Sequence, residues 1–393
     1  MPQPSTRIQN LPVYVFAEIG AKIRQLEITG ADVIRLDIGN PDMPPDDSVI
    51  NALYEHASTP SNHGYSGYRG IASFREAVAR FYKRRFNVEL DAETEVLPLI
   101  GTKEGIVNLT FAYISDGDIA LVPDIGYPSY AMGTQLAGGK VIYIPTDPNT
   151  FLLDISQIPT SMLDQSKLMW VNYPNNPTGA VATQEFYSEI LEICKKHDIL
   201  LASDNPYMDI TYDGYEASSF LEVPHSKDHA VEFFSLSKTY NMAGWRIGAV
   251  VGNSEALRHI LKVKSNVDGG HFKAIYEAGA VALDTVSDEW IAKRNLTYQV
   301  RRDLLFEALS HVGLSAKLPK ASLYLWAKIP ASFGNDDITF VNRILEEAHI
   351  SMAPGSAYGP AGNGYVRLSV SVSDTRLQEA IARLTRWFRN LDS

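Results

Sequence analysis

Residues 231–248 read VEFFSLSKTYNMAGWRIG and combine an apolar run with a lysine in a polar turn. The apolar run 231–234 is typical of a buried strand, and Lys238 follows it in a short turn rich in hydroxyl groups. A lysine is costly to bury without a reason, but a lysine held in a site can form a Schiff base with an aldehyde cofactor. The phosphate of such a cofactor could be bound by three side chains of the same stretch: Ser235, Ser237 and Arg246. A strand followed by a solvated turn is the alternative interpretation.

Composition limits the classes of protein to which the chain can belong. Its 393 residues suffice for a large core or two domains, and 45% apolar with 21% charged residues is ordinary for a globular protein. A net charge of −11 argues against nucleic acid and anionic membranes as partners. Cys194 is the single cysteine, so no internal disulfide can form. Because the sequence contains no apolar signal segment and no apolar run long enough to span a bilayer, we expect a soluble cytoplasmic protein.

The middle of the chain alternates short apolar runs with helical patterns, such as those over 104–113 and 183–197. Strands are predicted at seven places: 95–100, 119–123, 141–144, 168–172, 200–203, 231–234 and 247–251. Most of these runs are apolar throughout, which is typical of a sheet covered on both faces. We therefore predict an α/β fold with a three-layer α/β/α large domain built on a mostly parallel seven-stranded sheet.

The C-terminal part has a different pattern. Helices are expected at 288–312, 338–349 and 374–391, and strands at 323–329 and 365–370. This mixture indicates a smaller α+β domain, against which an N-terminal arm over 11–37 is expected to pack. The predicted division is 1–47 for the arm and part of the small domain, 48–284 for the large domain, and 285–393 for the small one.

Polar side chains follow several of the predicted strands. Gly101-Thr-Lys-Glu-Gly105 forms a strand-to-helix turn whose backbone N–H groups could hold a phosphate, although its spacing is not that of a P-loop and a tight structural turn is the alternative. Asn176 lies in a turn rich in Asn and Pro after another strand, at the sheet edge where α/β proteins place ligands. Such turn chemistry alone predicts only a β-turn.

Single residues near these turns suggest further contacts. Asp204 ends a strand and could keep the nitrogen of a pyridine-type ring protonated, and Tyr207 follows three residues later. Tyr127, after yet another strand, could stack on a flat ring. Arg367 sits inside an apolar strand and calls for an anionic partner, such as a substrate carboxylate. A helix cap, a packed aromatic and a structural salt bridge are the respective alternatives.

Together these motifs, in this order over nearly the whole chain, resemble the class I pyridoxal-phosphate aminotransferases of fold type I. The resemblance implies a pyridoxal 5'-phosphate cofactor, no metal ion, and a ping-pong transfer of an amino group from an L-amino acid to a 2-oxo acid. It implies that Lys238 is the Schiff-base lysine and proton carrier. It implies that Asp204 pairs with the pyridine nitrogen and that Asn176 and Tyr207 hold the ring hydroxyl oxygen, with Tyr127 stacked on the ring.

The resemblance also assigns the remaining contacts. Binding of the phosphate is implied for a group of five: Thr102, Lys103 through its backbone N–H, Ser235, Ser237 and Arg246. Arg367 would bind the substrate α-carboxylate, with Gly39 closing over it. Tyr65 would reach the cofactor phosphate of a partner subunit, because the family forms homodimers with shared active sites.

Within that family the chain is similar to the LL-diaminopimelate aminotransferase branch. The similar segments are 11–20, 101–106, Asn205 and 235–245. The distal end of the substrate has four candidate contacts: Tyr14, Tyr68, Lys103 and, across the dimer, Lys273. Tyr68 stands where plant-like members carry Glu. The alternatives are an alanine- or glutamate-type or broad-specificity aminotransferase and a carbon–sulfur β-lyase, whereas the absence of Arg from 263–277 argues against one aspartate subgroup.

Overall fold

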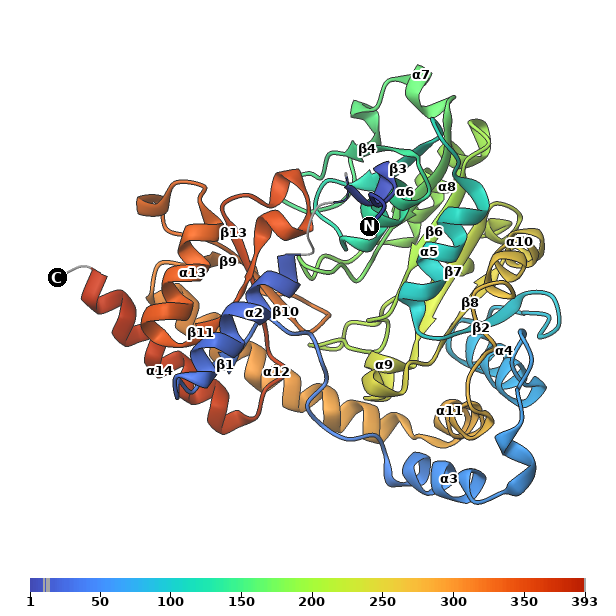
Figure 1. Ribbon diagram of the computed structural model, residues 1–393, viewed down its shortest axis with the longest axis horizontal. Coiled ribbons are helices and arrows are strands. Elements are labelled where there is room, and N and C mark those ends of the chain that lie inside the picture. Colours follow the sequence, from blue (N-terminus) through green and yellow to red (C-terminus); the bar gives the residue numbers. More distant parts are fainter. Residues whose placement is uncertain (10, 12–14, 392–393) are drawn as a thin grey trace.

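Seven strands form the central sheet of the computed structural model, which describes residues 1–9, 11 and 15–391 (Figure 1). They are β2 Val96–Leu99, β3 Ile119–Pro123, β4 Lys140–Ile144, β5 Ser166–Val171, β6 Leu200–Asp204, β7 Ala230–Ser235 and β8 Gly248–Gly252. The spatial order is β2-β8-β7-β6-β5-β3-β4, and β8 alone runs antiparallel to its neighbours. The predicted mostly parallel seven-stranded sheet is confirmed, because continuous apolar runs are the signature of strands buried on both faces.

Helices cover both faces of this sheet. One face carries α4 Ala72–Phe86, α8 Gln184–Lys196 and α11 Lys273–Thr285; the other carries α5 Thr102–Tyr113, α6 Ser129–Leu136 and α10 Ser254–Lys264. Side chains of one strand alternate between the two layers: on β5, Met169 and Val171 join the first core, and Leu168 and Trp170 join the second. Helix α3 (Asp47–Ala57) lies against α11 on the outside, and two single-turn helices complete this part: α7 Thr160–Leu163 and α9 Leu236–Thr239.

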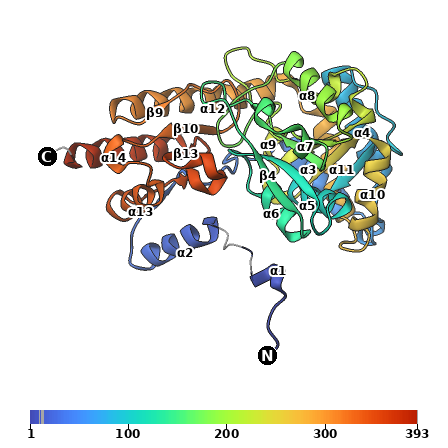
Figure 2. The same ribbon diagram turned by 90° about the horizontal axis from the view of Figure 1, so that it is seen from above.

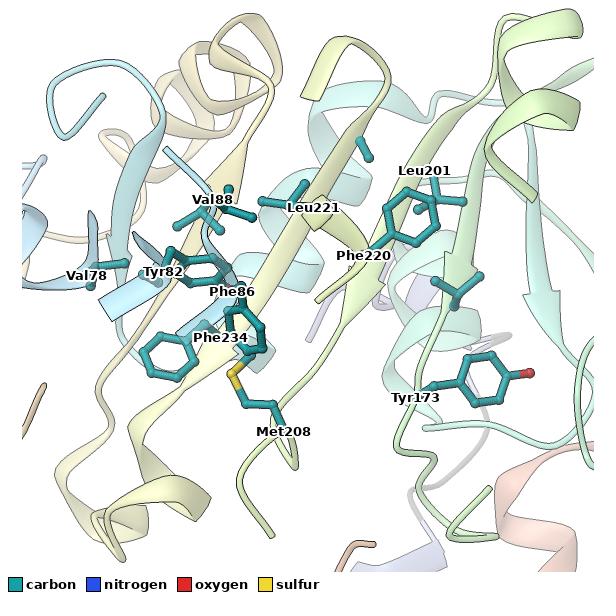
Figure 3. Packing of buried hydrophobic residues seen from close by; sticks show 14 of the residues in the cluster. Val78, Tyr82, Phe86, Val88, Tyr173, Leu201, Met208, Phe220, Leu221 and Phe234 are labelled. Atoms are coloured by element: carbon teal, nitrogen blue, oxygen red, sulfur yellow. The ribbon is translucent and has the colours of Figure 1, made fainter. Parts of the chain in front are cut away.

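An aromatic cluster fastens β7 to α4 (Figure 3). The rings of Phe234 and Phe81 stack with centroids 4.9 Å apart, and Tyr82 meets Phe234 edge-on at 6.0 Å. Phe81, Tyr82 and Phe234 are all buried, and full burial of one such ring contributes roughly 1.5–3 kcal/mol. The cluster therefore holds the end of β7 rigidly, immediately before Ser235.

A second, mostly antiparallel unit lies beside the first (Figure 2). Its sheet has the order β12-β13-β10-β9, built from β9 Ser315–Ala316, β10 Tyr324–Lys328, β12 Ala353–Pro354 and β13 Tyr365–Ser369. Its helices are α12 Asp288–His311, α13 Asp337–Ala348 and α14 Asp374–Leu391. Helix α12 extends from the neighbourhood of α11 to this second unit (Figure 1).

Most of the N-terminal segment packs on this second unit. Its first helix, α1 Thr6–Gln9, lies instead against α6 of the first unit. The segment continues with α2 Val15–Ile28 and β1 Ile34–Arg35, and β1 pairs in parallel with β11 Ile350–Ser351. On α2, Ile19 and Ile23 bury their side chains against Leu345 of α13. Of the helices in the described ranges, none is both long and apolar enough to cross a membrane.

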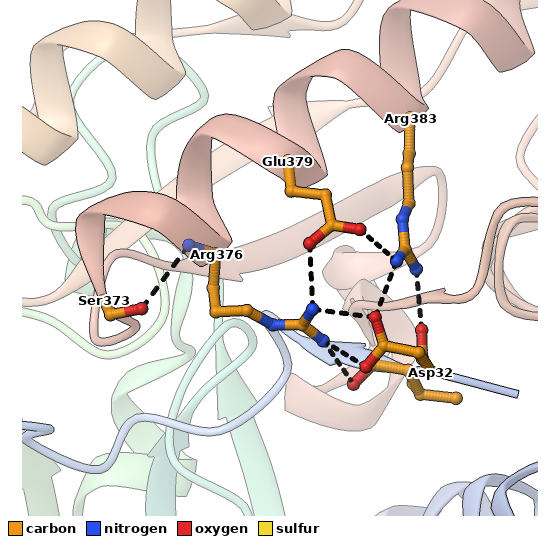
Figure 4. A network of polar contacts seen from close by, with 6 residues as sticks. Asp32, Ser373, Arg376, Glu379 and Arg383 are labelled. Carbon is orange, nitrogen blue, oxygen red and sulfur yellow. Dashed lines mark hydrogen bonds and ion pairs between the residues drawn. The ribbon is translucent and has the colours of Figure 1, made fainter.

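An ionic network ties the N-terminal segment to α14 (Figure 4). Asp32 accepts hydrogen bonds of 2.7 Å from both Arg376 and Arg383, and Glu379 lies between these two arginines. The hydrogen bonds from Arg376 and then Arg383 lower the pKa of the Asp32 carboxyl to about 2. The carboxylate is therefore ionised throughout the neutral range, and β1 enters the second unit next to it.

Candidate active site

The polar turns singled out in the sequence meet at one edge of the central sheet. Strands β2 and β7 are both antiparallel to β8, and their register places Leu99 and Ser235 on either side of Gly248. Strands β3, β5 and β6 are parallel to β7, so their carboxyl ends face the same edge. The turns that follow all of these strands are thus collected on one side of the sheet, as in other open α/β sheets.

A cavity of about 430 Å³ opens at this edge, between the central sheet and the residues around β1 and β13. It is lined by most of the predicted site residues: Gly39, Thr102, Lys103, Tyr127, Asn176, Asp204, Tyr207, Ser235, Ser237, Lys238, Arg246 and Arg367. Residues up to 330 positions apart in the sequence are in contact here. The fold therefore brings together groups that sequence reasoning had linked only by motif order.

Four predicted site residues are not among the described residues that line this cavity. Tyr65 is 94% exposed, and Tyr68 is also exposed, and neither lines the cavity of its own chain. Tyr14 lies outside the described residues. Lys273 is half-buried and does not line the cavity either, and its Nζ donates to the carbonyl oxygen of Ser61 at 3.2 Å.

Lys238 projects into the cavity from the single-turn helix α9. The side chain of Ser235 starts this helix by accepting a hydrogen bond from the backbone N–H of Ser237. Nζ of Lys238 donates to the carbonyl oxygen of Gly39. Burial, and then the positive charges of Arg367 and Arg246, lower the pKa of the Lys238 amine to about 7. The amine is therefore poised between its neutral and charged forms near neutral pH.

The buried Arg294 of α12 holds this helix from the other side. Its guanidinium donates to the carbonyl oxygen of Lys238 at 3.2 Å and to the carbonyl oxygen of Thr239. It also donates to the carbonyl oxygen of Asp209 at 2.5 Å. A cation at the C-terminal end of a helix satisfies its free carbonyl groups, so Arg294 fixes the backbone that carries the lysine.

One corner of the cavity is suited to a phosphate. Thr102 is the first residue of α5, and Gly101 before it has a φ of +73°. A Cβ at Gly101 would collide with the guanidinium of Arg246, so both the backbone conformation and the approach of Arg246 call for glycine. Free N–H groups at a helix start and a guanidinium are groups that bind phosphate. The hydroxyl groups of Ser235 and Ser237 line the same cavity.

The wall of the cavity also carries Asp204, a buried carboxylate at the end of β6. The Tyr130 hydroxyl donates to its Oδ2 at 2.6 Å, whereas Oδ1 has no hydrogen-bond partner among the described residues. Burial, with a smaller contribution from the charge of Glu232, raises the pKa of Asp204 to about 7, although the Tyr130 hydrogen bond opposes the shift. An unsatisfied buried carboxylate oxygen beside a cavity suits a protonated ring nitrogen, so this wall fits a pyridinium group.

Arg367 enters the cavity from β13. Its Nη1 donates to Oδ1 of Asn176 at 2.9 Å and its Nη2 to the backbone oxygen of Asp37 at 2.5 Å. Nε has no hydrogen-bond partner within the described part of the chain. The guanidinium lies 4.0 Å from the ring centroid of Tyr324, whose hydroxyl is 2.7 Å from that of Tyr207. A buried guanidinium with an unused donor can take a carboxylate.

Several lining residues were not found by sequence reasoning. They are Phe16, Arg35, Asp37, Asn172, Tyr324 and Tyr358, together with Tyr130 behind Asp204. Tyr324 and Tyr358 come from the second unit and carry no motif of their own. The alternation of charged and apolar residues in Ile34-Arg-Leu-Asp-Ile38, just before Gly39, is the one signal that could have pointed to Arg35 and Asp37.

The sheet order, the buried lysine and the phosphate corner define a fold type I pyridoxal-phosphate enzyme. The chain belongs to the family of aminotransferases of class I and II, whose family model matches residues 31–384. It is accordingly a transaminase that depends on pyridoxal 5'-phosphate.

Individual relatives cover nearly the whole chain. The LL-diaminopimelate aminotransferase of Moorella thermoacetica is 44% identical over 98% of both chains. Among solved structures, substrate-bound BacF from Bacillus subtilis superposes with a TM-score of 0.94 at 34% identity, covering 99% of this chain and 98% of that one. The aspartate aminotransferase of Thermus thermophilus with maleate superposes with a TM-score of 0.91 at 29% identity, covering 98% and 100%.

Proposed function

We propose that the chain is an LL-diaminopimelate aminotransferase, which exchanges an amino group between LL-diaminopimelate and 2-oxoglutarate as a cytoplasmic homodimer. The proposal is supported by curated relatives of that name at 44% identity over 98% of both chains. The observation that carries the transaminase chemistry is the lysine of lowered pKa in one cavity with Asp204 and Arg367.

The cofactor would be held at three points. Backbone N–H groups at the start of α5, with Ser235, Ser237 and Arg246, would bind its phosphate, and the free Oδ1 of Asp204 would accept from its ring nitrogen. Arg367 binds Oδ1 of Asn176, which leaves the Asn176 amide nitrogen to donate to the ring hydroxyl oxygen, with Tyr207 beside it. When bound, pyridoxal phosphate supplies a reactive aldehyde and an electron-withdrawing ring.

Lys238 would carry the proton of the transfer. An amine with a pKa of about 7 is neutral in a large fraction of molecules at neutral pH, so Nζ can accept the proton from the substrate α-carbon, hold it, and return it. Arg294 keeps the backbone of Lys238 in place while Nζ moves. The contact of Nζ with the carbonyl oxygen of Gly39 gives the charged form a resting partner.

Arg367 would orient the substrate. Its guanidinium is held on two sides, by Asn176 and by the backbone of Asp37, and its remaining donor suits an α-carboxylate. Gly39 lies close to the Tyr324 hydroxyl, where a Cβ would overlap it, so the segment at Gly39 can approach the substrate closely and exclude water. Tyr127, also in the cavity, would stack on the ring.

A spectral panel tests the function directly. We expect purified protein to show the visible absorption band of a covalently held cofactor, and LL-diaminopimelate and glutamate each to abolish that band. The Lys238→Ala variant should lack the covalent band and lose activity by about 10²–10⁴-fold or more, because the proton carrier is gone.

Other outcomes point elsewhere. A response to alanine without one to LL-diaminopimelate would indicate an alanine- or glutamate-type enzyme. Pyruvate and ammonia released from cystathionine, with no 2-oxo acid added, would indicate a carbon–sulfur β-lyase. A covalent band that persists in Lys238→Ala would contradict the role of the lysine.

A further inference from the structure

An ion pair at the end of β1 lines the cavity and has no part in the chemistry described above. Arg35 is the last residue of β1, Asp37 lies two residues further on, and both line the cavity. Nε and Nη2 of Arg35 donate to Oδ1 and Oδ2 of Asp37, each at 2.7 Å. Asp37 is 3% exposed, whereas Arg35 is 33% exposed.

The pair retains free hydrogen-bonding capacity on both sides. Nη1 of Arg35 makes no hydrogen bond to any described residue, although a guanidinium has five N–H donors and can bind a second carboxylate through its other edge. The Asp37 carboxylate accepts one hydrogen bond on each oxygen, and a carboxylate offers about four acceptor positions. Asp37 thus fixes the orientation of Arg35 without saturating either group.

The pair is joined directly to the anchor of the substrate. Arg367 donates to the backbone oxygen of Asp37, while Arg35 donates to the Asp37 side chain. One residue therefore sets the spacing between two guanidinium groups in the same cavity. A substrate whose α-carboxylate sits on Arg367 occupies the same cavity as the Arg35–Asp37 pair.

The charges of the cavity leave positive charge for a second carboxylate. Among the described lining residues five side chains are cationic and two are carboxylates. Lys238 is the proton carrier, Arg246 lies at the phosphate corner and Arg367 takes the α-carboxylate, so Arg35 and the side chain of Lys103 have no role in these contacts. The surplus of positive charge matches a dicarboxylate substrate. Of these two cations, Arg35 is the one whose orientation is fixed by an ion pair with another lining residue, Asp37.

We propose that Arg35 and Asp37 form the subsite for the distal end of the substrate, in which Arg35 binds the distal carboxylate and Asp37 binds the distal ammonium group. Glutamate and 2-oxoglutarate use Arg35 alone, and LL-diaminopimelate, whose distal end carries both charges, uses both residues. The assignment of Asp37 to the distal ammonium group rests on the proposed function. It supplies a partner for the distal amine although Tyr68 takes the place of an acidic residue.

The test compares matched variants of the holoenzyme. Arg35→Gln removes the charge, and Asp37→Asn removes the acceptor for the ammonium group. Arg376→Gln is the control, because Arg376 is also 33% exposed and also binds an aspartate, Asp32, through two hydrogen bonds of 2.7 Å (Figure 4). Arg376 does not line the cavity. Each variant must keep the visible band and the far-ultraviolet circular dichroism of the parent.

Two quantities are measured: the dissociation constants of unreactive acids and the KM values of substrates. In Arg35→Gln we expect the dissociation constant of glutarate, measured by calorimetry, to rise about tenfold or more, since charged hydrogen bonds are lost, and that of butyrate to stay within about twofold. The KM for glutamate should rise in parallel, and the KM for alanine should not. Asp37→Asn should raise the KM for LL-diaminopimelate more than the KM for glutamate. Arg376→Gln should change none of these values.

The outcomes separate this subsite from the proposed function. If glutarate binds Arg35→Gln as tightly as the parent, or if glutarate and butyrate weaken equally, the role of Arg35 is wrong. If Asp37→Asn affects LL-diaminopimelate and glutamate alike, the role of Asp37 is wrong. If the parent enzyme does not react with LL-diaminopimelate, the proposed function and the Asp37 part both fail, and the glutarate measurement still decides the role of Arg35.

Discussion

Lys238 shows how the surroundings set the chemistry of one side chain. The sequence places it one turn after a buried strand, and the fold then surrounds its amine with two guanidinium groups and little water. Each of these influences disfavours the ammonium form. The carbonyl oxygen of Gly39 is the one described acceptor that the amine contacts, and a neutral acceptor compensates for lost hydration only in part.

The lowered pKa of Lys238 predicts an unusual pH profile for the cofactor-free protein. Its pKa of about 7 instead of 10.5 means that the folded state binds fewer protons than the unfolded state between these values. The free energy of unfolding should therefore rise with pH through this window. Below pH 7 the full cost of burying the charged amine of Lys238 is present. Labelling of Lys238 by an amine-directed reagent, followed by mass spectrometry, should reach its plateau above about pH 8 and fall below pH 7.

A lysine in a short peptide, labelled in the same tube, serves as the reference. Its labelling should keep rising toward pH 10, as for an ordinary amine. A Lys238 profile that runs parallel to that of the peptide would show that the cavity does not alter the amine.

At the scale of elements, β7 connects the hydrophobic cores to the residues that carry the chemistry. Its side chains alternate between the two helical layers, with Phe233 in one core and Phe234 in the other, and its last residue is Ser235. The position of β7 in the sheet and its register then determine where the backbone of Lys238 lies. The precision of the site therefore depends on how the apolar side chains of β7 pack in the two cores.

Removal of one ring from this packing should reduce stability. We expect Phe234→Ala to lower the free energy of unfolding by about 3–5 kcal/mol, because Phe234 is fully buried and stacked on Phe81. Val300→Ala is the control, since Val300 is 52% exposed on α12 and its truncation should change stability by at most about 0.5 kcal/mol. Denaturant unfolding followed by circular dichroism measures both, and equal effects in the two variants would contradict the packing described.

The elements of the large sheet could be predicted because each carries its own signal. Apolar runs of four to six residues between turn residues identify strands locally, and the motif residues of the cavity stand directly after them. Strand β1 is only two residues long, and the short alternation over 34–38 around it was the sole local signal for it. Tyr130 and Tyr324 were missed for a different reason: their hydrogen bonds to Asp204 and Tyr207 depend on how distant elements pack, which no local pattern reports.

For the whole molecule, one protomer presents a surface that suits a second copy. Tyr65 is 94% exposed, and Tyr54 on α3 and Val267 before α11 are also large apolar residues in contact with solvent. Exposed aromatic groups of this size are typical of protein interfaces. The proposed homodimer would bury them and would bring Tyr65 to the cofactor phosphate of the partner.

Complementation between two defective subunits tests this arrangement. Lys238→Ala inactivates the site of its own chain, and Tyr65→Ala would weaken the site of the partner. When the two variants are mixed and refolded or allowed to exchange, hybrid dimers contain one intact site, so about a quarter of the parental activity should return from random pairing. Failure to regain activity in hybrids that are shown to form would mean that Tyr65 does not act across an interface.

The contact between Arg367 and the backbone of Asp37 has a consequence for synthesis on the ribosome. The two residues are 330 positions apart, and β1 likewise pairs with a strand near the end of the chain, β11. A nascent chain can assemble the large sheet long before the segment that supplies Arg367 has emerged. Until then the backbone oxygen of Asp37 lacks its partner and the substrate anchor does not exist, so the growing polypeptide passes through most of its translation unable to turn over any metabolite.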